Sequence, residues 1–309
     1  RMMGMAIRTN DLVGASREGW FSFKGEELID FMVDKRNEIL QLFIDEIESV
    51  DSKETRGPKI SIITTFYEGE EFLEGFLDNL TSQTIFDQCE LIMIDTGSPG
   101  NERAIIKPYL NRWPQITYIR HDKRSKPTVG LNLAIKESRG NYLTFAFLDD
   151  RKSLTCLEIL LAEIDSDDTV DLVYGNCLKT ETKNETFETS NASEFFSHSV
   201  PEFSRENMVK CLPGPMPLWR KALHEKNGLF DQDGCDYADD WEMWLRAVST
   251  GSQFKKVDKS VGLYLEGGRS QQSYNPEQRR EEAQIFYRYA RLFGQNFQSY
   301  KPYFDQFLN

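Results

Sequence analysis

The sequence predicts an α/β fold, with a mostly parallel central sheet flanked by helices and with helical extensions at both ends of the chain. Strand-like and helix-like segments alternate between residues 59 and 150, at the spacing typical of βαβ units. The strand-like segments are short runs rich in apolar and β-branched residues, as expected of strands buried on both faces. Outside the core, apolar residues recur at three- and four-residue steps, which is typical of amphipathic helices.

Four predicted strands make up the first half of the core. They are "KISIITTF" (59–66), "CELIMID" (89–95), "QITYIRH" (115–121) and "NYLTFAFL" (141–148). Helical patterns separate them at residues 68–83, 101–113 and 128–140. We expect the last of these helices to end at Gly140, because glycine readily adopts the left-handed conformation that closes many helices.

The second half of the core is less regular. Helical patterns cover residues 153–164, 238–251 and 275–293, strand patterns cover 170–180 and 261–268, and a proline-rich loop followed by a short helix covers 211–223. These changes of sequence pattern divide the chain into four predicted parts: 1–57, 58–150, 151–265 and 266–309. The two end parts are the helical extensions. They would either dock an oligomer or a larger synthase complex, or cover the core of the chain itself.

The composition excludes some classes of function. The chain has 37 Lys and Arg against 50 Asp and Glu, which gives a formal net charge of −13. We expect no nucleic acid as a partner, because phosphate contacts need a net basic face. Five scattered cysteines without CxxC spacing indicate a reducing compartment. Neither a spanning apolar run nor a signal-peptide pattern is present, so we expect a cytoplasmic protein.

Two adjacent acids follow the fourth predicted strand. Asp149 and Asp150 come directly after an almost wholly apolar run. Ligands of parallel α/β sheets bind at the carboxyl ends of the strands. Two neighbouring carboxylates repel each other but become favourable around a divalent cation. The alternative interpretation is an ordinary turn with both side chains in water.

Four segments share their order and spacing with the blocks of a known enzyme family. They are "ISIITTFYEGEEFLEGFLDNLTSQT", "ELIMIDTGSPGNE", "GLNLAIKESRGNYLTFAFLDD" and "GLFDQDGCDYADDWEMWLRA". The chain thereby resembles a family 2 glycosyltransferase with the GT-A fold, whose sheet is Rossmann-like. The resemblance implies an inverting, metal-dependent enzyme that moves a sugar from a nucleotide-diphosphate sugar, UDP being the commonest nucleotide, to an acceptor hydroxyl. It assigns residues 58–150 to the nucleotide-sugar and 151–265 to the acceptor.

The resemblance also implies a metal site and a catalytic base. The family's acidic cluster matches Asp149 and Asp150, so we expect Asp150 to hold Mn²⁺ or Mg²⁺, with Asp149 beside it near the ribose or the ligand waters. Phe147 stands where the first acid of the cluster would be. The family's base matches Asp240, with Asp239 as the alternative. Asp239 also has the spacing of an N-cap residue in a capping box.

Further positions carry over by resemblance. The predicted nucleotide-binding residues are Thr65, Tyr67, Asp95, Thr96, Arg124, Lys126, Asn132 and Asp149. Thr96 replaces a family Asp that often contacts the base, which leaves the base open. For each cation, a solvated loop charge is the alternative. No His occupies the family's third metal-ligand position, and Glu266 is the predicted substitute. Met216, Trp219 and Trp241 are predicted acceptor contacts, with simple packing as the alternative for each.

The leading functional prediction is therefore a glycosyltransferase acting on a glycan or lipid-linked acceptor in surface polysaccharide or glycoconjugate synthesis. A lipid-linked acceptor would bring the chain peripherally to a membrane, although its acidity suits anionic lipid poorly. A catalytically degenerate module with the same fold is the second hypothesis, motivated by Phe147, Thr96 and the missing His. A sugar-phosphate nucleotidyltransferase is less favoured, because the segment after the first strand is acidic rather than glycine-rich and basic.

Overall fold

The computed structural model describes residues 35–36, 57–190, 194–195, 201–267 and 275–308. The chain divides into two compact units, residues 1–56 and 57–309. In the first unit only residues 35 and 36 are described, and they are helical. The rest of the predicted N-terminal extension lies outside the described residues. The candidate site lies in the second unit.

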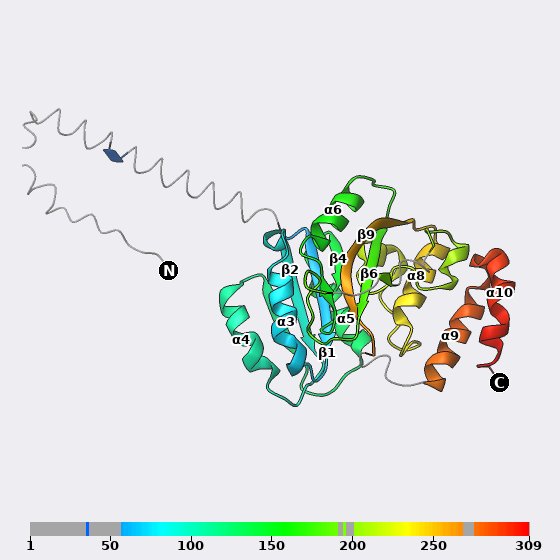
Figure 1. Ribbon diagram of the computed structural model, residues 1–309, viewed down its shortest axis with the longest axis horizontal. Coiled ribbons are helices and arrows are strands. Elements are labelled where there is room, and N and C mark those ends of the chain that lie inside the picture. Colours follow the sequence, from blue (N-terminus) through cyan, green and yellow to red (C-terminus); the bar gives the residue numbers. More distant parts are fainter. Residues whose placement is uncertain (1–34, 37–56, 191–193, 196–200, 268–274, 309) are drawn as a thin grey trace, which may run out of the picture. The chain divides into compact units, whose positions relative to one another are not determined.

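A nine-stranded sheet runs through the described part of the second unit (Figure 1). Its order is β3-β2-β1-β4-β8-β6-β9-β5, with β7 beside β6. The strands are β1 (Ile60–Phe66), β2 (Cys89–Asp95), β3 (Ile116–Arg120), β4 (Tyr142–Phe145), β5 (Arg151–Lys152), β6 (Leu172–Thr180), β7 (Glu194–Phe195), β8 (Leu218–Arg220) and β9 (Phe254–Leu265). The one sheet therefore spans both predicted halves of the core.

The first four strands are parallel, as predicted. In register, Phe66 of β1 lies opposite Asp95 of β2, and Asp95 lies opposite Arg120 of β3, so their carboxyl ends form one edge. β8 instead runs antiparallel to β4 and β6, and the sheet is mixed from there onward. β4 ends at Phe145, three residues earlier than predicted. The chain then turns, and Asp149 and Asp150 lie in that turn.

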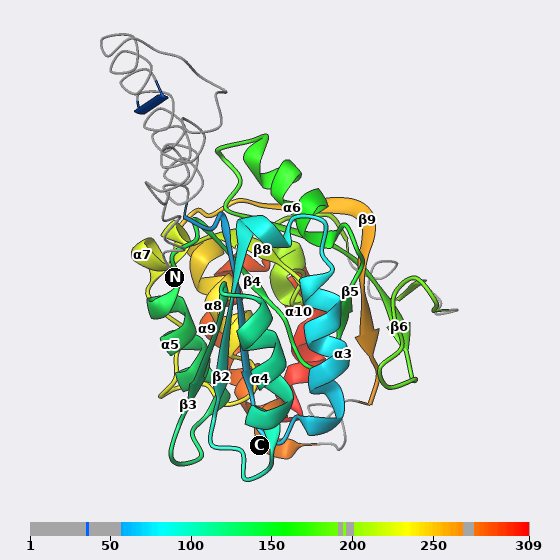
Figure 2. The same cartoon turned by 90° about the vertical axis from the view of Figure 1, so that its left-hand side faces the viewer.

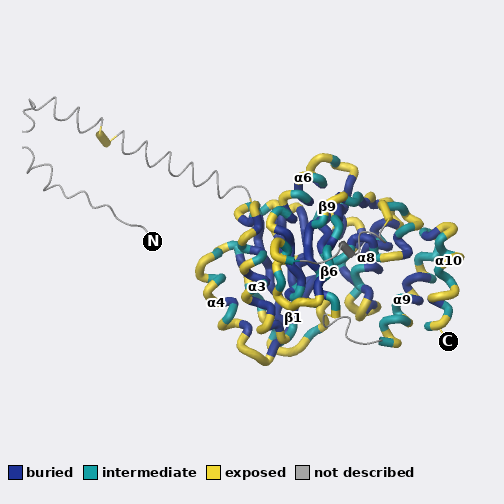
Figure 3. Tube along the Cα trace, viewed as in Figure 1, coloured by how far each residue is buried: buried dark blue, intermediate teal, exposed yellow. Residues whose placement is uncertain are grey.

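Helices cover both faces of the sheet (Figures 1 and 2). They are α3 (Glu70–Thr81), α4 (Glu102–Arg112), α5 (Pro127–Glu137), α6 (Cys156–Asp165), α7 (Ala222–Asn227), α8 (Asp239–Ser249), α9 (Pro276–Arg288) and α10 (Gly294–Asp305), with short 3₁₀ turns η1 (Phe86–Gln88), η2 (Glu206–Val209) and η4 (Ala290–Leu292). Alternate residues of a strand point to opposite faces. Accordingly, Ile62 packs in the cluster that contains α3 and α6, whereas Ile63 packs in the cluster that contains α5 and α8. Figure 3 shows the buried strands between the exposed outer sides of the helices.

The end of α5 differs from the prediction. The helix ends at Glu137, and Ser138 is already extended, so Gly140 does not cap it. Gly140 instead passes close to β1: a Cβ at this position would lie 2.7 Å from the backbone nitrogen of Ser61. A larger residue would therefore push the β4 strand away from its neighbour.

The C-terminal helices α9 and α10 pack against α8. The rings of Phe286 in α9 and Phe304 in α10 stack with centroids 4.2 Å apart. Trp241 of α8 stacks near Phe293 and Phe304, at 6.5 and 6.1 Å. The C-terminal part thus covers the chain's own core, and this predicted helical extension contains two helices where the pattern indicated one, over residues 275–293. Among the described residues, the helices are too short or too polar to cross a bilayer.

Candidate active site

The turn after β4 places Asp150 in the interior. Its side chain is 7% exposed, and the backbone N–H of Leu265, at the end of β9, donates to its Oδ1 over 3.2 Å. Burial first, and then the neighbouring carboxylate of Asp149, raises the pKa of Asp150 well above its usual value. Asp149 is only half-buried. The turn therefore places two adjacent carboxyl groups at the carboxyl edge of the sheet.

Arg151 fixes the shape of this turn, a role that the sequence did not indicate. Its Nη1 donates to the backbone carbonyls of Leu148 and Asp150, each over 2.7 Å, and its Nη2 donates to Asn184 Oδ1 over 2.6 Å. Its guanidinium is buried, and a buried cation needs such acceptors. Arg151 therefore holds the backbone of the acidic turn rather than the Asp150 carboxylate.

Glu266, the predicted third metal ligand, has a cationic partner in this structure. Glu266 directly follows Leu265, whose N–H donates to Asp150, and its own carboxylate forms an ion pair with Lys179. Within the described residues, no three His, Cys, Asp or Glu side chains gather closely enough to hold a metal ion. Asp149 and Asp150 still offer adjacent carboxylate oxygens, the donor type that Mn²⁺ and Mg²⁺ prefer. The fit to a cation therefore rests on these two residues.

The second acidic pair, Asp239 and Asp240, begins α8. The Thr128 hydroxyl donates to Asp239 Oδ2 over 3.2 Å, the N–H of Trp241 donates to Asp240 Oδ1 over 2.6 Å, and the Cys211 thiol lies 3.5 Å from Asp240 Oδ2. Burial, followed by the charge of Asp240, raises the pKa of Asp239 to about 6. Burial also raises the pKa of Asp240. Both acids therefore hold a proton more readily than an ordinary Asp.

The start of α8 is not capped in the predicted way. Ala238 is the N-cap residue, and no side chain of the predicted capping box bonds there. Instead, Glu281 of α9 accepts hydrogen bonds from the backbone N–H groups of Asp236, Tyr237 and Ala238, over 2.8 to 2.9 Å. A carboxylate at this end also suits the helix dipole. The C-terminal part therefore positions the helix that carries the acid pair.

One short loop contacts both acidic centres. At one end of the loop, Cys211 meets Asp240. At the other end, Pro215 and Met216 line a hollow of about 10 Å³ together with Asp150. Five residues span at most about 18 Å even when fully extended. Both carboxylate centres therefore lie beside one short loop.

Several predicted nucleotide contacts serve as internal supports of the strand ends. Asp95 is 1% exposed: its Oδ1 accepts from the N–H groups of Gly97 and Ser98, and its Oδ2 accepts from the Tyr118 hydroxyl. The Thr96 hydroxyl is also buried and donates to the Phe66 carbonyl over 2.8 Å. These bonds hold the turn after β2 in place. Both residues therefore support the carboxyl edge of the sheet from the protein interior.

Thr65, Tyr67 and Arg124 lie together near this edge. Arg124 places its guanidinium carbon 4.2 Å from the centre of the Tyr67 ring, a cation–π arrangement. The Thr65 hydroxyl has no hydrogen-bond partner in the described part of the chain and lies under Gly130 of α5. The loop that carries Arg124 packs on the turn of Gly97, whose φ of +97° favours glycine.

Lys126 and Asn132 hold the loop that leads to α8. The Lys126 ammonium lies 2.6 Å from Asp236 Oδ1. The Asn132 amide donates to the Phe230 carbonyl over 2.9 Å and accepts from the Phe230 N–H over 3.0 Å. Asn132 is 4% exposed, and its two bonds clamp α5 to this loop.

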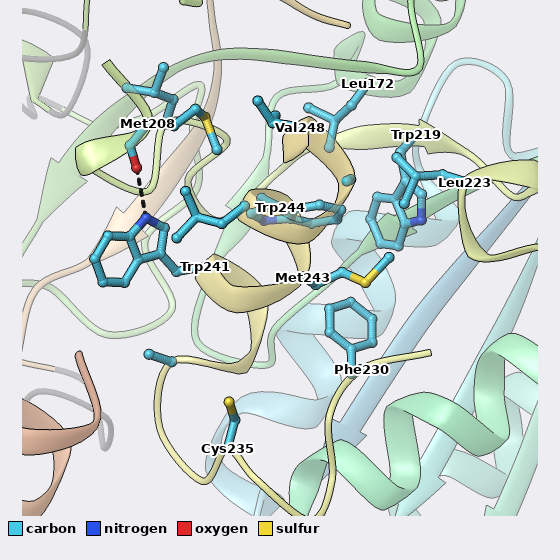
Figure 4. Packing of buried hydrophobic residues seen from close by; sticks show 14 of the residues in the cluster. Leu172, Met208, Trp219, Leu223, Phe230, Cys235, Trp241, Met243, Trp244 and Val248 are labelled. Carbon is cyan, nitrogen blue, oxygen red and sulfur yellow. Dashed lines mark hydrogen bonds between the residues drawn. The ribbon is translucent and has the colours of Figure 1, made fainter. Parts of the chain in front are cut away.

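The predicted acceptor residues Met216, Trp219 and Trp241 are all packed in the interior. Packing was the alternative interpretation for each of them. Trp219 is fully buried, and Figure 4 shows it beside Trp244 in the core. Trp241 is 6% exposed, and its indole N–H donates to the Met208 carbonyl over 2.9 Å, the dashed bond in Figure 4. Met216 is 3% exposed and sits against Gly262 of β9. None of the three offers an exposed face to an acceptor.

Comparison with known proteins places this fold and site in a class. A family model described as Glycosyl transferase family 2 matches residues 61–228. Because the match covers more than half of the chain, the chain belongs to glycosyl transferase family 2. The GT-A fold predicted from the sequence is confirmed by the structural neighbours below.

Individual relatives are distant. The uncharacterized glycosyltransferase EpsJ of Bacillus subtilis is 27% identical over 221 residues, which cover 69% of this chain and 62% of that protein. This chain thus spans less than two thirds of that relative. The structure of S. aureus TarS 1–349 in complex with UDP-GlcNAc has a TM-score of 0.62 at 18% identity, covering 78% of this chain and 72% of that one. The mannosyltransferase PcManGT from Pyrobaculum calidifontis, in complex with GDP-Man and Mn²⁺, has a TM-score of 0.59 at 18% identity, covering 76% and 65%.

Proposed function

We propose that this chain is an inverting, metal-dependent glycosyltransferase that moves a sugar from a UDP-sugar to a hydroxyl of a glycan or lipid-linked acceptor, in surface polysaccharide or glycoconjugate synthesis. One observation carries the proposal: Asp150 lines a hollow with one end of a short loop, and Asp240 contacts Cys211 at the other end of that loop. Family membership and neighbours solved with UDP-GlcNAc and GDP-Man support a nucleotide-sugar donor. A lipid-linked acceptor would bring the chain to the surface of a membrane.

Asp149 and Asp150 would hold the cation. A bound Mn²⁺ or Mg²⁺ would neutralise the charge that develops on the leaving diphosphate. In the protein alone, burial and the Asp149 charge disfavour an ionised Asp150. A divalent cation would reverse this preference, because an opposite charge within a few ångströms favours the carboxylate.

Asp240 would act as the general base. In an inverting reaction, the acceptor oxygen forms a bond to the anomeric carbon while the bond from that carbon to the diphosphate oxygen breaks. Asp240 would take the proton of the acceptor hydroxyl. Because burial raises its pKa, it is a stronger base than an ordinary Asp once it is ionised. Asp239, held by Thr128, would support it from the neighbouring position.

The test measures donor turnover and UDP binding by the full chain, with Mn²⁺ or with EDTA, for UDP- and GDP-sugars. We expect Asp150→Asn to lose metal-dependent UDP binding. Asp240→Asn should keep this binding and lose turnover, by about 10² to 10⁴-fold. Glu266→Gln is the matched control, because its carboxylate pairs with Lys179. The proposal fails if UDP binds equally well with EDTA, or if GDP-sugars alone turn over.

A non-catalytic module is the second candidate, and Phe147 favours it. This residue stands where the first acid of the family cluster would be, and its ring stacks on Phe145 with centroids 5.4 Å apart. An apolar ring cannot ligate a cation, so the site has one acid fewer than the family pattern. Metal-dependent binding of a nucleotide-sugar without any turnover, over several donors and acceptors, would select this candidate.

A further inference from the structure

A second hollow lies at the opposite end of α8 from the acid pair. Its volume is about 570 Å³, and its lining includes Arg205, Glu206, Ser249, Arg288, Arg291 and Gly294. These residues come from the η2 region, the last turn of α8 and the α9–α10 connection. Because an α-helix rises 1.5 Å per residue, Ser249 is about 15 Å along α8 from Asp239. The hollow is therefore separate from the candidate active site.

The three arginines have few acceptors within the protein. Arg205 donates one bond to the Val248 carbonyl over 3.4 Å, and Arg288 lies 3.8 Å from Glu242 Oε1. In the described part of the chain, Arg291 has neither a hydrogen bond nor an ion pair, and all three residues are exposed. Each guanidinium carries five N–H donors. Most of this donor capacity is therefore available to a ligand in the hollow.

The hollow also keeps a positive charge within an acidic protein. Glu206 supplies a carboxylate, but its side chain lies against Gly294, the first residue of α10. There it faces the positive end of the helix dipole. Among the described residues, Glu206 forms no ion pair with the three arginines. Three guanidinium groups around one hollow repel each other unless an anion lies between them.

We propose that this arginine hollow binds a phosphate group. The planar fork of a guanidinium matches two oxygens of a phosphate, and charge-assisted bonds of this kind are the stronger ones in proteins. A free phosphate and the phosphate of an anionic lipid headgroup offer the same chemistry. The proposal does not depend on the proposed function, since it involves neither acid pair.

The test uses the full chain and inorganic phosphate, with EDTA present to remove metal-held binding elsewhere. Calorimetry compares the wild type, the double variant Arg205→Gln/Arg291→Gln and the control Arg103→Gln, which changes an exposed arginine on α4. We expect the double variant to bind phosphate at least about tenfold more weakly, because each lost charged hydrogen bond is worth about a factor of ten. The control should bind as the wild type does.

A vesicle arm separates the two sources of phosphate. Wild-type binding to phosphatidylglycerol vesicles but not to phosphatidylcholine vesicles, lost in the double variant, would assign the hollow to a lipid headgroup. Phosphate binding without vesicle binding would assign it to a soluble phosphate. If the wild type binds neither probe, or the double variant binds phosphate as tightly as the wild type, the proposal is overturned.

Discussion

The hydroxyl of Thr128 donates to Asp239 Oδ2 over 3.2 Å, which joins the first turn of α5 to the first turn of α8. The two residues are 111 positions apart in the sequence. α5 follows the loop that carries Arg124 and Lys126, and α8 carries the acid pair. This contact therefore ties the predicted nucleotide side of the site to the acid pair that contains the predicted base.

The acid pair predicts the pH dependence of the reaction. A general base must be ionised, so kcat/KM falls as the pH drops through its pKa. Because burial raises the pKa of Asp240, the proposed base, we expect the acid limb at a higher pH than an ordinary Asp would give. An unperturbed Asp would place it near pH 4. The Asp240 charge raises the pKa of Asp239, whereas Asp239 does not raise that of Asp240. Asp239→Asn should therefore leave this limb in place, as measured by initial rates across that range.

Asp239→Asn also tests the assignment of the base. The Asn side chain can still accept the Thr128 bond, so the geometry of the helix start is retained. If this variant loses turnover while Asp240→Asn keeps it, the roles of the two acids are the reverse of those proposed.

A substitution of Asn132 tests whether this residue clamps α5 to the loop or contacts the nucleotide. Asn132→Ala leaves the buried N–H and carbonyl of Phe230 without partners, which should lower the free energy of unfolding by about 2 to 4 kcal/mol. Denaturant unfolding measures this loss, and UDP affinity should change by less than about twofold. Asn111→Ala, at an exposed position on α4, is the control. A large loss of UDP affinity with unchanged stability would contradict the clamp.

Glu281 tests the link between the C-terminal helices and the base. Glu281→Gln removes the charge and one acceptor oxygen from three N–H groups at the start of α8. We expect kcat to fall by about tenfold or more, because misplacing a catalytic group is costly, with little change in UDP affinity. Glu277→Gln, which loses one exposed bond from Tyr237, should be close to wild type. Equal kcat values in the two variants would rule out this role.

His224 predicts acid sensitivity of the fold. The Trp219 indole donates to its Nε2, so its Nδ1 donates to the Gly228 carbonyl and the ring is neutral. Burial lowers its pKa to about 4, below the unfolded value of 6.5. The unfolded chain then binds more protons between these values, so stability should fall by about 3 kcal/mol as the pH drops from 6.5 to 4. His224→Gln should remove this part of the pH dependence in urea unfolding.

The strands of the first half were predictable because each is an apolar run buried on both faces. β1 and β2 match the prediction to within one residue. β4 was predicted too long because the apolar run continues through Leu148, which is also buried although it lies in a turn. Burial alone does not distinguish a strand from a buried turn.

The site was predictable where it depends on short segments, and not where it depends on distant ones. The two Asp pairs could be placed because each lies at the end of a recognisable element. Trp219 could not, because the antiparallel pairing of β8 with β4 carries it into the core. The contacts of Thr128, Cys211 and Glu281 join residues far apart in the chain, and no local pattern indicates them.

Glu281 accepts hydrogen bonds from the backbone at the start of α8. This interaction limits how far the polypeptide can be shortened. A fragment trimmed to the family blocks would end at Leu265. It would expose the indole of Trp241 to water and would leave three backbone N–H groups at the start of α8 without an acceptor. Such a fragment should aggregate on expression even though it keeps every acid of the site. A minimal soluble fragment must extend through Phe304.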